Sequence, residues 1–112
     1  MKLTKLAASL AIAALAGFST QTIAADADAA AALFKKNDCS KCHSIDKSKK
    51  GPALKKIAAK YKGKADGQAS IVKSITSGAK VKLDDGSEEE HKIIDTKDQA
   101  ALKNLADWVL AQ

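Results

Sequence analysis

Five consecutive residues, Cys39 to His43, constrain the fold most strongly because they read C-x-x-C-H. Two thiols three residues apart project from the same side of a helical turn, so both can add to the two vinyl groups on one edge of a porphyrin. The imidazole of His43 then lies beneath the ring and can bind the iron from that side. The motif predicts one haem c, attached covalently through Cys39 and Cys42.

The sequence also allows two other roles for these side chains. Cys39 and Cys42 can form a disulfide, although the βαβ pattern expected around a redox-active C-x-x-C is absent. The two cysteines, His43 and His91 also supply four ligands, the number that a zinc ion needs. However, the adjacent Cys42 and His43 are awkwardly placed for one tetrahedral ion, and the usual finger spacings do not occur.

The N-terminus has the organisation of a secretory signal peptide. Two lysines precede thirteen uncharged, mostly apolar residues, Leu6 to Phe18, and a polar stretch then runs into small residues. With cleavage at Ala25, residues 1–25 form the signal peptide and residues 26–112 the haem domain, which predicts a periplasmic location. Thirteen apolar residues fall short of the roughly 20 that a transmembrane helix needs, so we expect no membrane span in the mature chain.

The mature domain has few large apolar side chains for its size. Removal of the signal peptide leaves 87 of the 112 residues, with only eighteen large apolar or aromatic side chains. A domain this small is marginally stable without a disulfide, a metal or another internal staple. Burying about 500 Å² of macrocycle at about 25 cal/mol/Å² contributes on the order of 10 kcal/mol, an upper bound. A haem would therefore complete the core.

Apolar residues recur at helical spacing over most of this domain, which predicts an all-α fold: a compact bundle of about four helices wrapped round the haem. We expect a first helix at 28–37 capped by Asp26 or Asp28, and a second opened by Pro52. A third is expected at 68–77 before Gly78, and a last one after a capping box of Thr96 and Gln99. Between them, residues 79–95 are expected to form a long loop with a turn at 84–86, and loops of that length are usually functional.

Lysine alone carries the positive side-chain charge of the chain. All nineteen basic residues are lysines, and the absence of arginine argues against nucleic-acid binding. Losing two of them with the signal peptide gives a net charge of +4. Eight lysines and no acid lie in 47–64, whereas five acids lie in 84–90. We expect a dipolar monomer that docks transiently on acidic surfaces of periplasmic redox proteins, unless the lysines only solvate a helix face.

Together these features resemble a small periplasmic monohaem class I c-type cytochrome. The attachment motif follows a first helix, Gly51 and Pro52 come next, and a long loop precedes a closing helix that carries Trp108. The resemblance implies that the carbonyl of Pro52 accepts a hydrogen bond from His43 and fixes its tautomer, which makes Gly51 and Pro52 part of the haem site. We expect Trp108 to pack the closing helix against the first rather than to contact the ring.

The family normally supplies a methionine sulfur as second axial ligand from the loop before the closing helix. The only methionine here is Met1, in the predicted signal peptide, whereas His91 lies in that loop and is the only other histidine. We hypothesise iron ligation by His43 and His91, with Lys80, Lys82 or Lys92 as alternative amine ligands and an ordinary surface role as the alternative for His91. Because methionine raises the reduction potential, such a site should have a lower potential than its sulfur-ligated relatives.

The sequence leaves two functions of different classes. The first is a periplasmic electron carrier that is not an enzyme, because its iron changes oxidation state while no substrate bond is made or broken. The second is a haem-based ligand-binding or sensing protein, in which the distal position is open or His91 leaves the iron. A haem-free thiol or zinc protein is a third, more remote interpretation.

Overall fold

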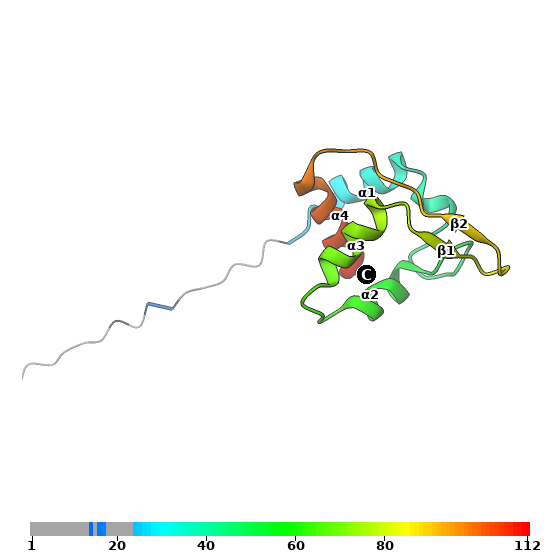
Figure 1. Cartoon of the computed structure of the whole chain (residues 1–112). Coiled ribbons are helices and arrows are strands. Elements are labelled where there is room, and N and C mark those ends of the chain that lie inside the picture. Colours follow the sequence, from blue (N-terminus) through cyan, green and yellow to red (C-terminus); the bar gives the residue numbers. More distant parts are fainter. Residues whose placement is uncertain (1–13, 15, 18–23) are drawn as a thin grey trace, which may run out of the picture.

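A computed structural model describes residue 14, residues 16–17 and residues 24–112. Most of the predicted signal peptide therefore lies outside the described residues. None of the helices in the described part of the chain combines the length and the apolar character needed to cross a bilayer. The predicted all-α fold is confirmed, since residues 24–112 form four helices gathered into a compact body (Figure 1). The elements are α1 (Ala27–Lys36), the 3-10 turn η1 (Cys39–Lys41), α2 (Leu54–Tyr61), α3 (Gly67–Thr76), β1 (Lys80–Lys82), β2 (Glu88–Glu90) and α4 (Gln99–Leu110).

Helix α1 begins one residue earlier than predicted, because Asp26 rather than Asp28 is its N-cap. The Asp26 carboxylate accepts a hydrogen bond from the N–H of Ala29 at 3.1 Å. The side-chain amide of Asn104, on α4, also bonds to both main-chain groups of Asp26. Its Oδ1 accepts from the Asp26 N–H at 2.7 Å, and its Nδ2 donates to the Asp26 carbonyl at 2.9 Å. The start of α1 is thereby held against α4.

Helix α2 begins at Leu54, two residues after the proline that was predicted to open it. The first free N–H groups of the helix, those of Leu54 and Lys55, donate to the carbonyls of Ser44 and Ile45. The carbonyl of Pro52 is turned away from the helix towards His43. Pro52 therefore ends the loop that follows the attachment motif instead of forming the first helical turn.

Helix α3 ends just before a glycine, and helix α4 begins after an aspartate. Gly78, with φ +63°, follows the C-cap of α3 as predicted, since a left-handed residue is favoured there. At the start of α4 the predicted capping box is wrong, because Asp98 is the N-cap and its carboxylate accepts from the N–H of Ala101 at 3.1 Å. The hydroxyl of Thr96 instead accepts from the N–H of Asp98, which shapes the turn that leads into the helix.

The segment 79–95 is not the structureless loop that was predicted. Strands β1 and β2 pair antiparallel, and Gly86, with φ +85°, provides the predicted turn between them. The register places Lys80 opposite Glu90 and Lys82 opposite Glu88. Opposite charges facing each other across two strands stabilise a pair whose side chains offer little apolar surface. A strand with two lysines opposite a strand of three glutamates therefore marks this hairpin in the sequence.

Helix α4 is the centre of the core and packs against α1, α2 and α3 (Figure 1). It contributes half of the buried cluster, and the other helices and the segment after β2 contribute the rest. The cluster consists of Ala30, Leu54, Ile71, Ile94, Leu102, Leu105, Ala106 and Val109. Trp108 stacks on Phe34 of α1 with ring centroids 5.5 Å apart and planes inclined at 60°. Trp108 thus joins the first and last helices, as predicted.

Candidate haem site

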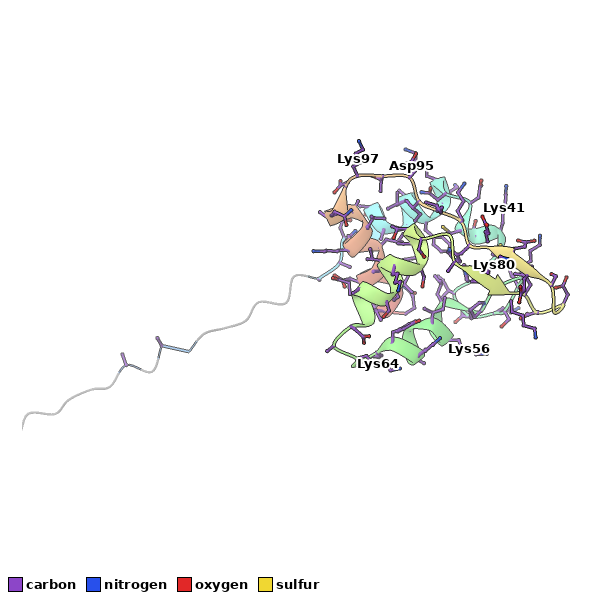
Figure 2. The ribbon with its side chains drawn as sticks, viewed as in Figure 1. Lys41, Lys56, Lys64, Lys80, Asp95 and Lys97 are labelled. Atoms are coloured by element: carbon purple, nitrogen blue, oxygen red, sulfur yellow. The ribbon has the colours of Figure 1, made fainter. Side chains whose placement is uncertain are left out.

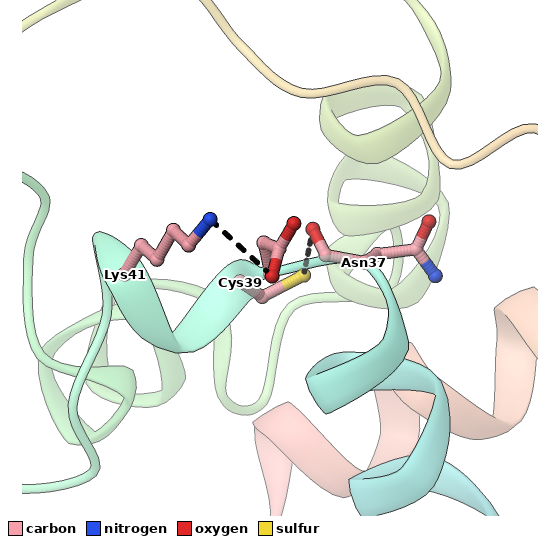
Figure 3. Close-up of polar contacts among 4 residues, drawn as sticks. Asn37, Cys39 and Lys41 are labelled. Atoms are coloured by element: carbon pink, nitrogen blue, oxygen red, sulfur yellow. Dashed lines mark hydrogen bonds and ion pairs between the residues drawn. The ribbon is translucent and has the colours of Figure 1, made fainter.

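The two cysteines lie at the ends of the η1 turn, directly after α1. Asp38 enters this turn with φ +57°, and the N–H groups of Cys42 and His43 both donate to the carbonyl of Cys39. Both thiols are free and half-buried. The Cys39 Sγ lies 3.9 Å from the carbonyl oxygen of Asn37, while Lys41 pairs with the carboxylate of Asp38 (Figure 3).

Burial raises the pKa of the Cys39 thiol above its usual range. A redox-active C-x-x-C pair needs the opposite, a thiol whose pKa is lowered so that the thiolate attacks at neutral pH. The environment of Cys39 therefore does not suit disulfide exchange. The described residues also contain no group of three or more His, Cys, Asp or Glu side chains that could hold a metal ion, so the four side chains counted for zinc do not form such a group.

The imidazole of His43 is oriented by the loop that follows it. Its Nδ1 donates to the carbonyl of Pro52 at 2.7 Å, the contact that the resemblance implied. The loop is closed by a bridge between His43 and Ser48 and by the Gly51 N–H, which donates to the carbonyl of Cys42 at 2.9 Å. Burial lowers the pKa of His43, and the Pro52 carbonyl acts in the opposite direction. A neutral ring with its proton on Nδ1 leaves the Nε2 lone pair free to bind a metal.

Gly51 makes this orientation possible because any side chain there would occupy the space of the imidazole. A Cβ atom at Gly51 would lie 2.7 Å from Cε1 of His43 and 3.1 Å from its Nδ1. Real Cβ contacts are essentially never as short as the first of these. The role of Gly51 in the site is therefore to leave room for the ring of His43.

Replacing Gly51 by Ala should displace the His43 ring and weaken its bond to Pro52. We expect a loss of about 1–3 kcal/mol in the free energy of unfolding, as for overpacked cores, together with a changed Soret spectrum. The matched control is Gly63→Ala, since Gly63 has φ +76° but no atom within 4 Å of the position that a Cβ would take. That variant should cost stability through its backbone alone and leave the spectrum unchanged. A Gly51→Ala protein with the wild-type spectrum would contradict the role of Gly51 in leaving room for the His43 ring.

His91 follows β2 directly and is held by main-chain contacts on both sides. Its N–H donates to the carbonyl of Ala79 at 2.9 Å, and three residues later the N–H of Ile94 donates to the carbonyl of Ile75 at 2.8 Å. The Nδ1 of His91 lies 2.9 Å from the carbonyl oxygen of Lys92. That carbonyl can only accept, so the ring carries its proton on Nδ1 and its Nε2 is free. This contact could not be found from the sequence, because a bond to the next residue's carbonyl has no characteristic side-chain pattern.

The imidazoles of His43 and His91 both line the main cavity in the part of the chain that the structure describes. Their ring centroids are 6.1 Å apart and their planes are inclined at 39°. Metal–imidazole bonds are about 2.0–2.1 Å for zinc, so one metal ion between two such nitrogens takes up about 4 Å, and the half-widths of the two rings fill the rest. The spacing and the free Nε2 atoms fit a single metal centre between His43 and His91.

The cavity itself has a volume of about 490 Å³ and is lined mainly by apolar side chains. Cys39 and Cys42 line it together with both histidines. Its apolar lining consists of Phe34, Pro52, Leu54, Ile57, Tyr61, Ile71, Ile75, Val81, Leu83, Leu105 and Val109. Two thiols, two imidazoles and an apolar wall are the donor set and surroundings that a covalent haem requires. Of the alternative amine ligands, Lys82 and Lys92 line the cavity and Lys80 does not.

Comparisons with known proteins show the family of this chain. The model of the cytochrome c family matches residues 27–111. Cytochrome c-552 of Nitrosomonas europaea is 38% identical over 92 residues, which cover 82% of this chain and 86% of that protein. Cytochrome c-551 of Pseudomonas denitrificans is 50% identical over 48 residues, 43% of this chain, and the match spans only 58% of the length of that relative.

Among solved structures, the class 1 cytochrome MtoD from Sideroxydans lithotrophicus ES-1 is similar in both sequence and fold. It is 53% identical with a TM-score of 0.76, and the alignment covers 79% of this chain and 97% of that one. The family match confirms the predicted cofactor, one haem c attached covalently through Cys39 and Cys42.

Proposed function

We propose, because the chain belongs to the cytochrome c family, that it is an electron carrier of the periplasm with His43 and His91 as the axial ligands of its haem. When bound, the haem supplies an iron that alternates between the ferrous and ferric states. The observation that supports this assignment is the pair of imidazoles, 6.1 Å apart across the cavity, each with its Nδ1 against a main-chain carbonyl. Gly51 and Pro52 belong to the same site through their contacts with His43.

The protein groups around the cavity suit electron transfer better than substrate chemistry. The carbonyls of Pro52 and Lys92 fix the tautomers of the two histidines, so both rings present a basic nitrogen without rearrangement. With His43 and His91 both bound, the iron would have no free position for a substrate. The lining of the cavity around the two rings is mainly apolar. These features favour outer-sphere transfer over catalysis, and two imidazoles favour a lower potential than methionine ligation.

Spectroscopy of the purified holoprotein tests this proposal against the ligand-binding alternative. We expect low-spin absorption and EPR spectra in the ferric state, a low-spin ferrous state, and little or slow change when carbon monoxide is added. Six-coordinate iron has to lose a ligand before it can bind a gas. A fast and complete shift of the ferrous spectrum under carbon monoxide would instead place the protein in the sensing class.

The periplasmic location rests on the signal peptide predicted for residues 1–25. It is supported by the small c-type cytochromes that the chain resembles. Mass spectrometry of the exported protein tests the prediction, since the mature chain should begin at Asp26 and carry one haem. A chain that retains its first 25 residues would contradict both the cleavage site and the proposed location.

The lysine-rich surface between residues 47 and 64 is the part of the molecule that we propose as the docking face. Figure 2 shows Lys56 and Lys64 on the outer side of the α2 region, with Lys97 on the opposite side of the molecule in this view. Lys60 lies at the edge of the haem cavity, and one neighbour, Lys55, pairs with Asp46. The fitting partner is an acidic surface of another redox protein, bound transiently, because a basic field next to the haem edge steers such encounters.

Salt should slow electron transfer with an acidic redox partner if this surface guides docking. Electrostatic steering raises association rates by about 10–10³-fold and is lost as ionic strength rises. We expect Lys56→Gln with Lys60→Gln to lower the second-order rate constant at low salt and to flatten its salt dependence, whereas Lys97→Gln should change neither. Rates that stay flat with salt in the wild type would rule out the docking face. Stopped-flow kinetics at several ionic strengths measure the effect.

A further inference from the structure

The turn of the β1–β2 hairpin faces the loop that follows the attachment motif across a second, smaller cleft. This cleft has a volume of about 320 Å³ and lies outside the main cavity. Figure 1 shows the hairpin tip extending beside that loop. The residues that line the cleft are Lys49, Lys50, Leu83, Asp84, Asp85, Ser87 and Glu89. Lys49 and Lys50 also belong to the proposed docking face, whereas the acidic wall of the cleft has no part in the electron-transfer proposal.

The two walls of the cleft have opposite charge. Lys49 and Lys50 form one wall, and Asp84, Asp85 and Glu89 contribute three acids to the other. The hydroxyl and N–H of Ser87 lower the pKa of Asp85, and the charge of Lys50 acts in the same direction across the cleft. The tip is thus negatively charged at neutral pH and lies opposite two ammonium groups.

Each wall is continuous with one of the two histidines. The lysine wall precedes Gly51, whose carbonyl accepts from the N–H of Lys49, and the ammonium of Lys49 donates to the carbonyl of Ser40 at 2.9 Å. The lysine wall is therefore fixed to the turn that carries the cysteines. On the other side, Glu89 lies two residues before His91 and lines both cavities.

The hairpin is anchored differently at its two ends. At the base, His91 is bound to the carbonyl of Ala79. Beyond the base, Ile93 approaches Gly78 so closely that a Cβ there would lie 2.9 Å from its Cδ1. The tip has no comparable packing in the described residues, because Asp84, Asp85 and Gly86 are all exposed. Across the cleft the acids of the tip lie opposite Lys49 and Lys50, and the charge of Lys50 acts on Asp85.

We propose that this cleft is an electrostatic clasp in which Lys49 and Lys50 hold the acidic tip of the hairpin and so keep His91 in place over the haem cavity. The effect of the clasp on the iron rests on the proposed ligation by His91. The attraction between the two walls does not depend on that ligation. Since both walls are exposed to solvent, salt weakens it. His91 is then released more often as ionic strength rises, and the distal position becomes more accessible.

Hydrogen exchange and carbon monoxide binding of the intact holoprotein test the clasp. The variant Lys50→Glu reverses one charge of the lysine wall, and Lys47→Glu is its matched control because Lys47 lies in the same loop but not in the cleft. From the coupling of exposed charge pairs we expect Lys50→Glu to speed exchange of the His91 and Leu83 amides about five-fold. Carbon monoxide should bind the ferrous protein faster by a similar factor.

A second substitution keeps the test independent of folding defects. In the double variant Lys50→Glu with Asp84→Lys the charges face each other with reversed sign, so exchange should return towards the wild-type rate. High salt should abolish the difference between Lys50→Glu and the wild type. Equal hairpin exchange in Lys50→Glu, Lys47→Glu and the wild type would overturn the clasp. Faster exchange with an unchanged rate of carbon monoxide binding would leave the clasp standing and count against His91 as the ligand.

Discussion

Replacing His91 by Ala is expected to abolish the low-spin ferric spectrum and to open the iron to rapid binding of carbon monoxide. The ring centroid of His91 lies 6.1 Å from that of His43, and its Nδ1 lies against the carbonyl of Lys92. With the proposed ligation by both histidines, removing this ring would leave His43 as the only histidine on the iron. Because spin state follows the number of strong axial ligands, the expected change in the EPR spectrum is complete unless Lys82 or Lys92 supplies an amine.

Two further variants separate His91 from its neighbours. Lys82 and Lys92 also line the cavity, so an amine can take the place of the missing ring. Combining His91→Ala with Lys92→Gln also removes Lys92, which is closer to His91 in the sequence than Lys82. His91→Met offers a sulfur at the same position and should restore a low-spin spectrum with a raised reduction potential, since methionine ligation raises it. A low-spin signal that survives His91→Ala with its original g-values would show that His91 is not a ligand of the iron.

The second large effect is expected from Cys39→Ser combined with Cys42→Ser, which should prevent covalent attachment and unfold the domain. An emptied cavity of about 490 Å³ at about 24 cal/mol per Å³ costs up to about 12 kcal/mol. Small domains are stable by only about 5–15 kcal/mol in total, and the buried cluster has only eight residues. Mass spectrometry should give the polypeptide mass without haem, and circular dichroism should show the loss of helix.

The control for the cysteine variant changes the same turn without touching a thiol. The side chain of Ser40 lies between the two cysteines in sequence, and the carbonyl of Ser40 accepts a hydrogen bond from the Lys49 ammonium. Ser40→Ala keeps that carbonyl and should therefore carry haem and fold as the wild type does. If the double cysteine variant stayed folded and helical without haem, the core would not depend on the cofactor. If the wild type exported by a cytochrome-maturing bacterium had the bare polypeptide mass, the attachment itself would be wrong.

The helices and the cysteine motif could be predicted because their signals are local. Leu102, Leu105 and Val109 recur at helical spacing, and all three are buried in α4. Helix ends were harder to predict because several side chains compete to cap them. Thr96 and Asp98 both suit an N-cap, and only the path of the chain into α4 decides that Asp98 caps the helix.

The hairpin and the approach of the two histidines could not be derived in the same way. Strand β1 alternates over only three residues and β2 consists of three glutamates, so the usual polar–apolar alternation is too short to indicate a hairpin. The position of His91 depends on its bond to Ala79 and on the bond of Ile94 to Ile75, which join segments distant in sequence. His91 was singled out from a resemblance and from the missing methionine, whereas its orientation required the structure.

The contact between the first and last helices has a consequence for how the protein matures. In a chain that emerges N-terminus first, α1 and the two thiols appear well before α4, against which α1 packs. The amide of Asn104 can bind the main chain of Asp26, and Trp108 can pack against Phe34, only when synthesis of the closing helix is complete. Until then the cysteine pair stays on an open, unfinished polypeptide. The topology therefore makes closure of the core by α4 a late step, after the segment that carries both thiols has emerged.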